Sequence, residues 1–223
     1  MASAPLLAPP TPPYKPRVAI ALRELVQPAH TALVTQECQR GVIGDHSLLP
    51  ELARAAAPML ANIVRLAEAA RRLGVSVVHC TAIRRADRRG ASTNARLFSA
   101  TQKSPVSMVP GSPAAEIVPE LGMHASDIVV PRLHGLSPMH GTELDPILRN
   151  LGVRTVIAVG VSINVALTNL VFDAVNSGYQ VVLPRDAVAG IPASYVDAVF
   201  EHTLTLVTTV AMTDQILAQW GTT

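Results

Sequence analysis

The chain has 223 residues, of which 49% are hydrophobic and 15% are charged, and its formal net charge is +2. Such a high apolar content excludes an intrinsically disordered chain, because disorder needs low hydrophobicity and a high net charge. The near balance of 18 basic and 16 acidic residues argues against a nucleic-acid partner, and 3% aromatic residues provide few stacking platforms for single strands. The length fits one domain.

The two ends of the chain differ in composition. Residues 1–16 are rich in proline and have no basic region ahead of their apolar residues, so we predict a flexible arm rather than a signal peptide. Residues 17–223 are expected to form a single α/β domain. No run of about 18 uninterrupted apolar residues occurs, so no membrane span is expected. Cys38 and Cys80 lie in apolar, strand-like runs, which favours buried free thiols and a cytoplasmic location.

The predicted elements alternate between strands and helices. In chain order we expect a short edge strand at 18–25, a strand at 31–37, a helix at 49–73, a strand at 75–80, a long loop at 84–113, a strand at 127–130, a helix at 143–151, a strand at 155–159, a helix at 163–177, a strand at 179–183, a helix at 193–206, a strand at 207–212 and a helix at 214–220. Pro58 falls inside the first long helix and predicts a kink or a later start. A loop as long as 84–113 is typical of a lid or an interface.

The strands are continuous runs of valine, isoleucine and leucine. This pattern indicates an α/β fold with a mostly parallel sheet that is buried on both faces. In such sheets ligands bind beyond the carboxyl ends of the strands. The residues that follow each strand are therefore the candidates for a functional site.

Charged groups follow two of the strands, and a glycine turn follows a third. Glu37 ends the first buried strand, and Arg132 follows the strand at 127–130. The turn at 160–166 opens a helix whose first N–H groups can bind an anion, with Ser162 as a candidate cap. These groups either converge on one pocket, or Glu37 and Arg132 form only a structural ion pair.

Three segments carry a further signal: VIAVGVSINVALTNLVFDAVNSGYQVVLPRDAVAG at 156–190, IVVPRLHGLSPMHGTEL at 128–144 and the opening TALVTQECQ. Together they resemble the isochorismatase-like hydrolases, often called the cysteine hydrolase superfamily. The resemblance extends from about residue 31 to 217. It implies a Rossmann-like three-layer α/β/α sandwich, a cis peptide at Val161–Ser162 and a homo-oligomer.

The chain departs from this family at its catalytic triad. The family uses Asp, Lys and Cys, and the equivalent positions here are Glu37, Arg132 and Ala166. Amide hydrolysis through a covalent intermediate needs a thiolate, which alanine lacks. Cys38 follows Glu37 along a strand and is expected to point to the opposite face. Ala166 would also fit a Cys-to-Ala variant of an amidase, although the other two departures argue against that interpretation.

True isochorismatases also lack the cysteine, and the resemblance implies a vinyl-ether hydrolysis in which an acid protonates carbon before water adds. Glu37 is then the candidate acid or base. Arg132 is permanently charged, so it either binds a substrate carboxylate or locks Glu37 as an ionised partner. We therefore predict a hydrolase of a small, anionic metabolite that works without a cysteine. The alternative is a catalytically silent homologue that binds a metabolite or a protein partner.

The remaining candidates are weaker. Predicted substrate contacts beside the triad positions are Gln39, His134, Val161, Ser162 and Val165. Other polar residues have a structural or surface role by default: His79, His140, Asn164, Thr168, Asp186, Arg84, Arg85, Arg88 and Arg89. The sequence has no closely spaced set of histidine and aspartate ligands, so we expect no metal, and we expect no cofactor. The expected partners are a small molecule and further copies of the chain, with no nucleic acid and no membrane.

Overall fold

The computed structural model describes residues 20–47 and 49–221, and its centre is a six-stranded sheet in the order β3-β2-β1-β4-β5-β6. All neighbouring strands are parallel. The strands are β1 (Thr31–Gln36), β2 (Ser76–Ala82), β3 (Ile128–Arg132), β4 (Thr155–Gly160), β5 (Gln180–Pro184) and β6 (Thr209–Ala211). The order reverses between β1 and β4, and such a switch point is where open α/β sheets bind ligands.

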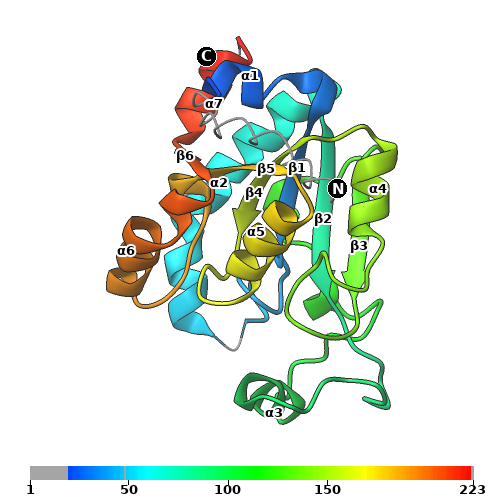
Figure 1. Ribbon diagram of the computed structural model, residues 1–223. Helices are drawn as coiled ribbons and strands as arrows, with labels where there is room; N and C mark the ends of the chain where they lie inside the picture. Colours follow the sequence, from blue (N-terminus) through cyan, green and yellow to red (C-terminus); the bar gives the residue numbers. More distant parts are fainter. Residues whose placement is uncertain (1–19, 48, 222–223) are drawn as a thin grey trace, which may run out of the picture.

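Helices cover both faces of the sheet (Figure 1). One face is covered by α2 (Pro50–Arg72) and α7 (Thr213–Gln219), and the other by α4 (Leu144–Asn150), α5 (Ala166–Asn176) and α6 (Ala193–His202). Two further helices are α1 (Leu22–Leu25) and α3 (Arg96–Gln102), and 3-10 turns occupy Pro28–His30, Pro113–Ala115, Pro119–Leu121, Arg185–Ala187 and Leu204–Leu206. The predicted three-layer α/β/α sandwich is confirmed.

Burial along the strands explains the layers. Every residue of β1 is buried; Leu33 joins the core under α2, whereas Ala32 and Val34 join the core under α5. This alternation is what a strand between two helical layers requires. Helix α2 runs unbroken past Pro58, whose exposed position keeps the ring away from the buried face.

Several predicted boundaries need correction. An edge strand was expected at 18–25, but the described part of this segment contains the short helix α1 instead. Just beyond α1, Trp220 Nε1 donates to Val26 O (2.7 Å). The loop expected at 84–113 contains α3, which has no buried residue and hence no amphipathic signal. The helix predicted at 163–177 begins only at Ala166, and the one at 193–206 ends at His202. The predicted arm at 1–16 lies outside the described residues. Within them, no helix is long and apolar enough to cross a membrane.

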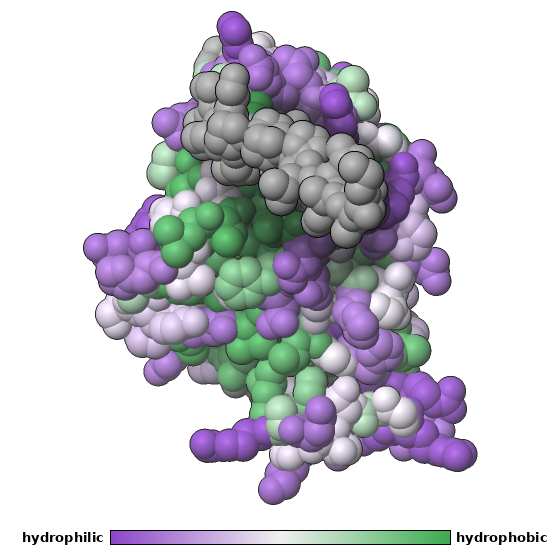
Figure 2. All heavy atoms as spheres, in the orientation of Figure 1, coloured by the Kyte–Doolittle hydropathy of each residue, from purple (hydrophilic) through white to green (hydrophobic). Residues whose placement is uncertain are grey.

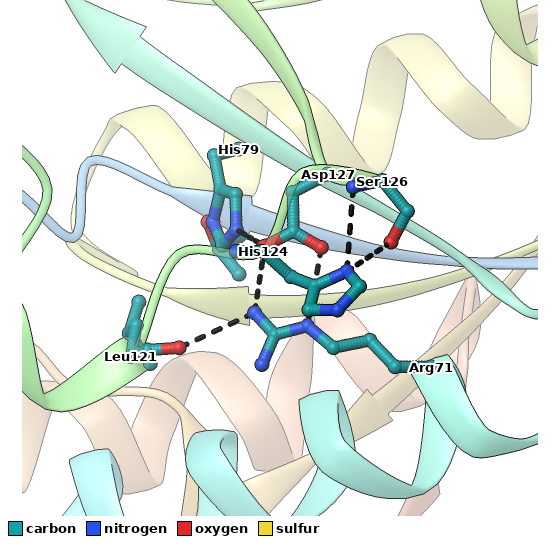
Figure 3. A network of polar contacts seen from close by, with 7 residues as sticks. Arg71, His79, Leu121, His124, Ser126 and Asp127 are labelled. Atoms are coloured by element: carbon teal, nitrogen blue, oxygen red, sulfur yellow. Dashed lines mark hydrogen bonds and ion pairs between the residues drawn. The ribbon is translucent and has the colours of Figure 1, made fainter.

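A buried charge network joins α2 to the sheet (Figure 3). Arg71, in the last turn of α2, donates from Nη2 and Nε to the two carboxylate oxygens of Asp127, at 2.7 and 3.1 Å. The Asp127 side chain is only 1% exposed. The His124 N–H also donates to this carboxylate (2.9 Å), so Asp127 is held at the start of β3 by groups from two elements.

His79 on β2 completes the network. Its Nε2 lies 3.3 Å from Asp127 Oδ2, and its Nδ1 lies 2.8 Å from the Thr35 hydroxyl on β1. Burial lowers the pKa of His79, although the hydrogen bond and charge of Asp127 work in the opposite direction. His79 is therefore a hydrogen-bonded structural residue that joins neighbouring strands.

The substitution Asp127→Asn should lower the free energy of unfolding by about 3 kcal/mol, because it leaves the Arg71 charge without its buried partner. The matched control is Asp214→Asn, which breaks the Arg65–Asp214 pair of similar length (2.6 Å) but high exposure. The control should cost less than about 1 kcal/mol. Urea unfolding at neutral pH measures both, and equal losses would contradict the assigned importance of burial.

His79 should also make stability depend on pH. The unfolded chain protonates this histidine as the pH falls through its ordinary value of 6.5, while the folded protein, with its lowered pKa, resists protonation. The unfolded state then binds more protons, so stability falls as the solution is acidified below about pH 6.5. His79→Gln should flatten the urea midpoint against pH, whereas the exposed His202→Gln should keep the original slope. If the urea midpoints of the parent and of His79→Gln change equally with pH, His79 is not the source of this pH dependence.

Candidate functional site

Glu37 leaves the end of β1 in an unusual backbone conformation. Its φ is +50°, a region that non-glycine residues seldom occupy. The Glu37 N–H donates to Cys80 O (2.9 Å), and the Gln39 N–H donates back to Glu37 O (2.8 Å). These bonds hold the sharp turn that aims the Glu37 side chain over the strand ends.

The Glu37 carboxylate meets Arg132, which comes from the end of β3. Arg132 Nη2 donates to Glu37 Oε1 at 2.6 Å, and Gln36 Nε2 donates to the same oxygen at 3.0 Å. The two charged side chains are 8% and 15% exposed. Because β2 lies between β3 and β1, the arginine reaches across one strand to make this pair. Arg132 Nη1 is buried and has no partner among the described residues, so one face of the guanidinium is free to bind a further group.

The turn after β4 provides the third side of the site. Gly160 has φ +106°, and a Cβ there would lie 2.4 Å from Gln36 O, so only glycine fits. The Val161–Ser162 peptide is cis, as the resemblance implied. Helix α5 then begins at Ala166 with no side-chain cap: Ser162 contributes its carbonyl, not its hydroxyl, to the first turn. In the described part of the chain, no acceptor is bonded to the Ala166 N–H.

A cavity of about 510 Å³ lies over these groups. Its inner end is lined by the three triad-position residues Glu37, Arg132 and Ala166, and by predicted contacts His134, Ser162 and Val165. Alanine at residue 166 adds only a methyl group to this wall. Three groups thus meet around one cavity: a carboxylate, a guanidinium with one unpartnered nitrogen, and the start of a helix.

Two predicted contacts do not reach the cavity. The Gln39 amide donates to Ala82 O (3.1 Å) and Ala115 O (2.9 Å) and accepts from the Ala82 N–H (2.7 Å), so both of its donors and its oxygen hold backbone segments together. Val161 is fully buried, and its N–H donates to Gln36 O (3.0 Å). Both residues shape the site from behind its wall.

The weaker polar candidates also have structural partners. The Asn164 amide exchanges two hydrogen bonds with the Ile191 backbone, and the Thr168 hydroxyl donates to Ile163 O. Asp186 accepts from the Thr213 N–H and hydroxyl at the start of α7. Among the described residues, no three His, Cys, Asp or Glu side chains are grouped so that they could hold a metal ion.

Neither cysteine is available as a nucleophile. Both thiols are buried and free. Burial, with a smaller contribution from the charge of Glu37, raises the pKa of the Cys38 thiol to about 12, and burial raises that of Cys80 to about 12 as well. Since the thiolate is the reactive form, both cysteines are inert in the folded protein.

The outer wall of the cavity comes from the segment predicted as a loop. It includes Leu97 and Phe98 of α3 and the cationic residues Arg84, Arg88 and Lys103. Figure 2 shows hydrophilic side chains around the end of the molecule where Figure 1 places α3, below an apolar band on the front face. Two features of the sequence indicated this wall: the cluster of arginines and the length of the predicted loop. Nothing in the sequence pattern indicated Lys103.

The fold and site define an α/β sandwich protein with a ligand cavity over the carboxyl ends of its strands. The family model of the isochorismatase domain matches residues 31–215. The chain therefore belongs to the isochorismatase family, a family of hydrolases.

One protein is similar in part of its sequence, and two solved structures are similar in fold. An uncharacterized isochorismatase family protein of Bacillus subtilis (strain 168), YwoC, is 32% identical over 75 residues, which are 34% of this chain and 39% of that protein. A cysteine hydrolase from Pseudomonas syringae pv. phaseolicola 1448A has the same fold, with a TM-score of 0.77 and 23% identity over 88% of this chain and 95% of its own. The N-carbamoylsarcosine amidase of Thermoplasma acidophilum is similar over 83% and 97% of the two chains, with a TM-score of 0.66 and 22% identity.

Placing a thiol at the start of α5 tests the geometry directly. We expect Ala166→Cys to take up one iodoacetamide adduct per native chain, because residue 166 faces the cavity while Cys38 and Cys80 are buried. The parent protein should take up none over the same period, as measured by intact mass. Unfolded samples, in which every thiol reacts, are the control. Labelling of the native parent, or failure to label native Ala166→Cys, would contradict this placement.

Proposed function

We propose that this protein hydrolyses a small anionic metabolite without a cysteine nucleophile, using Glu37 to activate water. The observation that carries the proposal is the convergence of Glu37, Arg132 and Ala166 on one cavity. Arg132 and Gln36 both donate to Glu37 Oε1 and not to Oε2, which leaves Oε2 to take a proton from water and supports the role of a base over the acid role of a vinyl-ether mechanism.

In the proposed reaction, water occupies the space beside the Ala166 methyl group. Its oxygen attacks an electrophilic carbon of the substrate while Glu37 takes its proton. The same carboxyl group then passes that proton to the leaving nitrogen or oxygen. The unpartnered Nη1 of Arg132 and the Ala166 N–H are donors for the oxygen on which negative charge develops.

A second candidate is a binding protein that has lost catalysis. The direct 2.6 Å bond between Arg132 and Glu37 favours it, because this contact occupies the carboxylate that the reaction needs. A third candidate is a Cys-to-Ala variant of an amidase. The substitution Ala166→Cys distinguishes it from the other two, since a restored thiol alone would then produce strong amide hydrolysis. Homo-oligomer formation and a cytoplasmic location remain predictions.

The test is turnover across a panel of vinyl ethers, amides and ureides. For the substrate hydrolysed fastest, Glu37→Gln should lower kcat by about 10²- to 10⁴-fold, because the amide cannot accept the proton of water. Glu116→Gln, at an exposed ion pair with Arg40 outside the cavity, should leave kcat unchanged. Unchanged turnover in Glu37→Gln would refute the base role. No turnover on the panel, with ligands still raising the Tm, would favour the binding protein.

A further inference from the structure

Three cations in the outer wall of the cavity have no part in the proposed reaction. Arg84 donates from Nη1 to Thr101 O (2.5 Å) and from Nη2 to Val106 O, and Arg88 donates to Gln102 O. All these acceptors are neutral backbone carbonyls. Within residues 20–47 and 49–221, no carboxylate forms an ion pair with Arg84, Arg88 or Lys103.

The charge of the cavity is therefore unbalanced. Its lining contains a single carboxylate, Glu37, and Arg132 already pairs with it. Burial lowers the pKa of Arg84, and the like charge of Arg88 lowers it further, so these two cations repel each other. Concave sites with uncompensated charge of one sign attract ligands of the opposite sign.

Two of the cations lie with α3, away from the strand that carries Glu37. Arg88 and Lys103 both lie at the C-terminal end of α3, which Figure 1 shows beyond the ends of the strands. Apolar residues also line the cavity, among them Phe98, Leu133 and Leu136. A ligand that contacts both ends needs an apolar body and a charged terminus.

We propose that the substrate is an amphipathic anion whose doubly charged group, a phosphate monoester or a pair of carboxylates, is bound by Arg84, Arg88 and Lys103. Its apolar body lies against α3 and the 133–136 segment. The position of its cleavable bond, beside Glu37 and Ala166, rests on the proposed function; the anion site itself does not.

Calorimetric titration of the full chain with small aromatic probes, each checked by mass for hydrolysis during the titration, tests the anion site. Phenyl phosphate and isophthalate represent the two sources of double charge, benzoate carries one charge, and benzamide is neutral. We expect either doubly charged probe to bind at least about tenfold more tightly than benzamide, with benzoate between them, and added salt to reduce this difference. Benzamide binding as tightly as both doubly charged probes would overturn the proposal.

Variants locate the site. Arg88→Gln and Lys103→Gln should each reduce the affinity ratio of the better doubly charged probe to benzamide by about three- to tenfold. The control is Arg85→Gln, in the same segment but paired with Asp87 (2.8 Å) and absent from the cavity lining, and it should leave the ratio unchanged. If the cations only hold the outer wall in place, the affinities of the doubly charged probe and of benzamide fall equally in each variant. Their ratio then stays constant, and this result would overturn the proposal.

The two proposals fail separately. Glu37→Gln should lower turnover as predicted above but retain binding of the charged probe, because Glu37 is not one of its ligands. Turnover without a preference for charged probes would refute the anion site and leave the proposed reaction standing. A preference for charged probes without turnover of any substrate would refute the proposed reaction and leave the anion site standing.

Discussion

The site depends on one buried ion pair, between Glu37 at the end of β1 and Arg132 at the end of β3. Either charge alone would be costly at such low exposure, whereas together they offset much of that cost. The pair joins two strands that are not neighbours in the sheet, and Gln36 supports it with a further hydrogen bond to the same oxygen. The cavity lies over this contact, and the turn after β4 brings Ala166 to it from the other side of β1.

The two ends of the cavity differ in how firmly they are held. Beneath the reacting end, the buried network of Arg71, Asp127, His79 and Thr35 ties α2, β1, β2 and the start of β3 together. The outer wall, by contrast, contains a helix with no buried residue, held by bonds from Arg84 and Arg88 to backbone carbonyls. A rigid scaffold with a loosely packed, ligand-facing segment is a common arrangement of binding sites.

Sequence patterns were informative where burial imposes a period. The strands β1 and β4 and the helix α2 were predicted to within about two residues, since continuous apolar runs and three-to-four spacing reflect their packing. The segment at 18–25 was assigned to a strand, because a short apolar run suits either kind of element. Gln39 was assigned to the substrate for a related reason: an amide can serve a ligand or the backbone equally well, and only the fold shows Ala82 and Ala115 within its reach.

The sequence by itself determined the parallel α/β class, the charged residues that end the strands and the absence of a thiol at residue 166. These features are local, because each is a residue type at a place in a periodic pattern. Only the tertiary structure decided that Arg132 bonds to Glu37, 95 residues away, with one guanidinium nitrogen left free. It also decided that Lys103 shares a cavity with both. Such contacts depend on strand order and on the path of a long loop, and neither is encoded in any short stretch of chain.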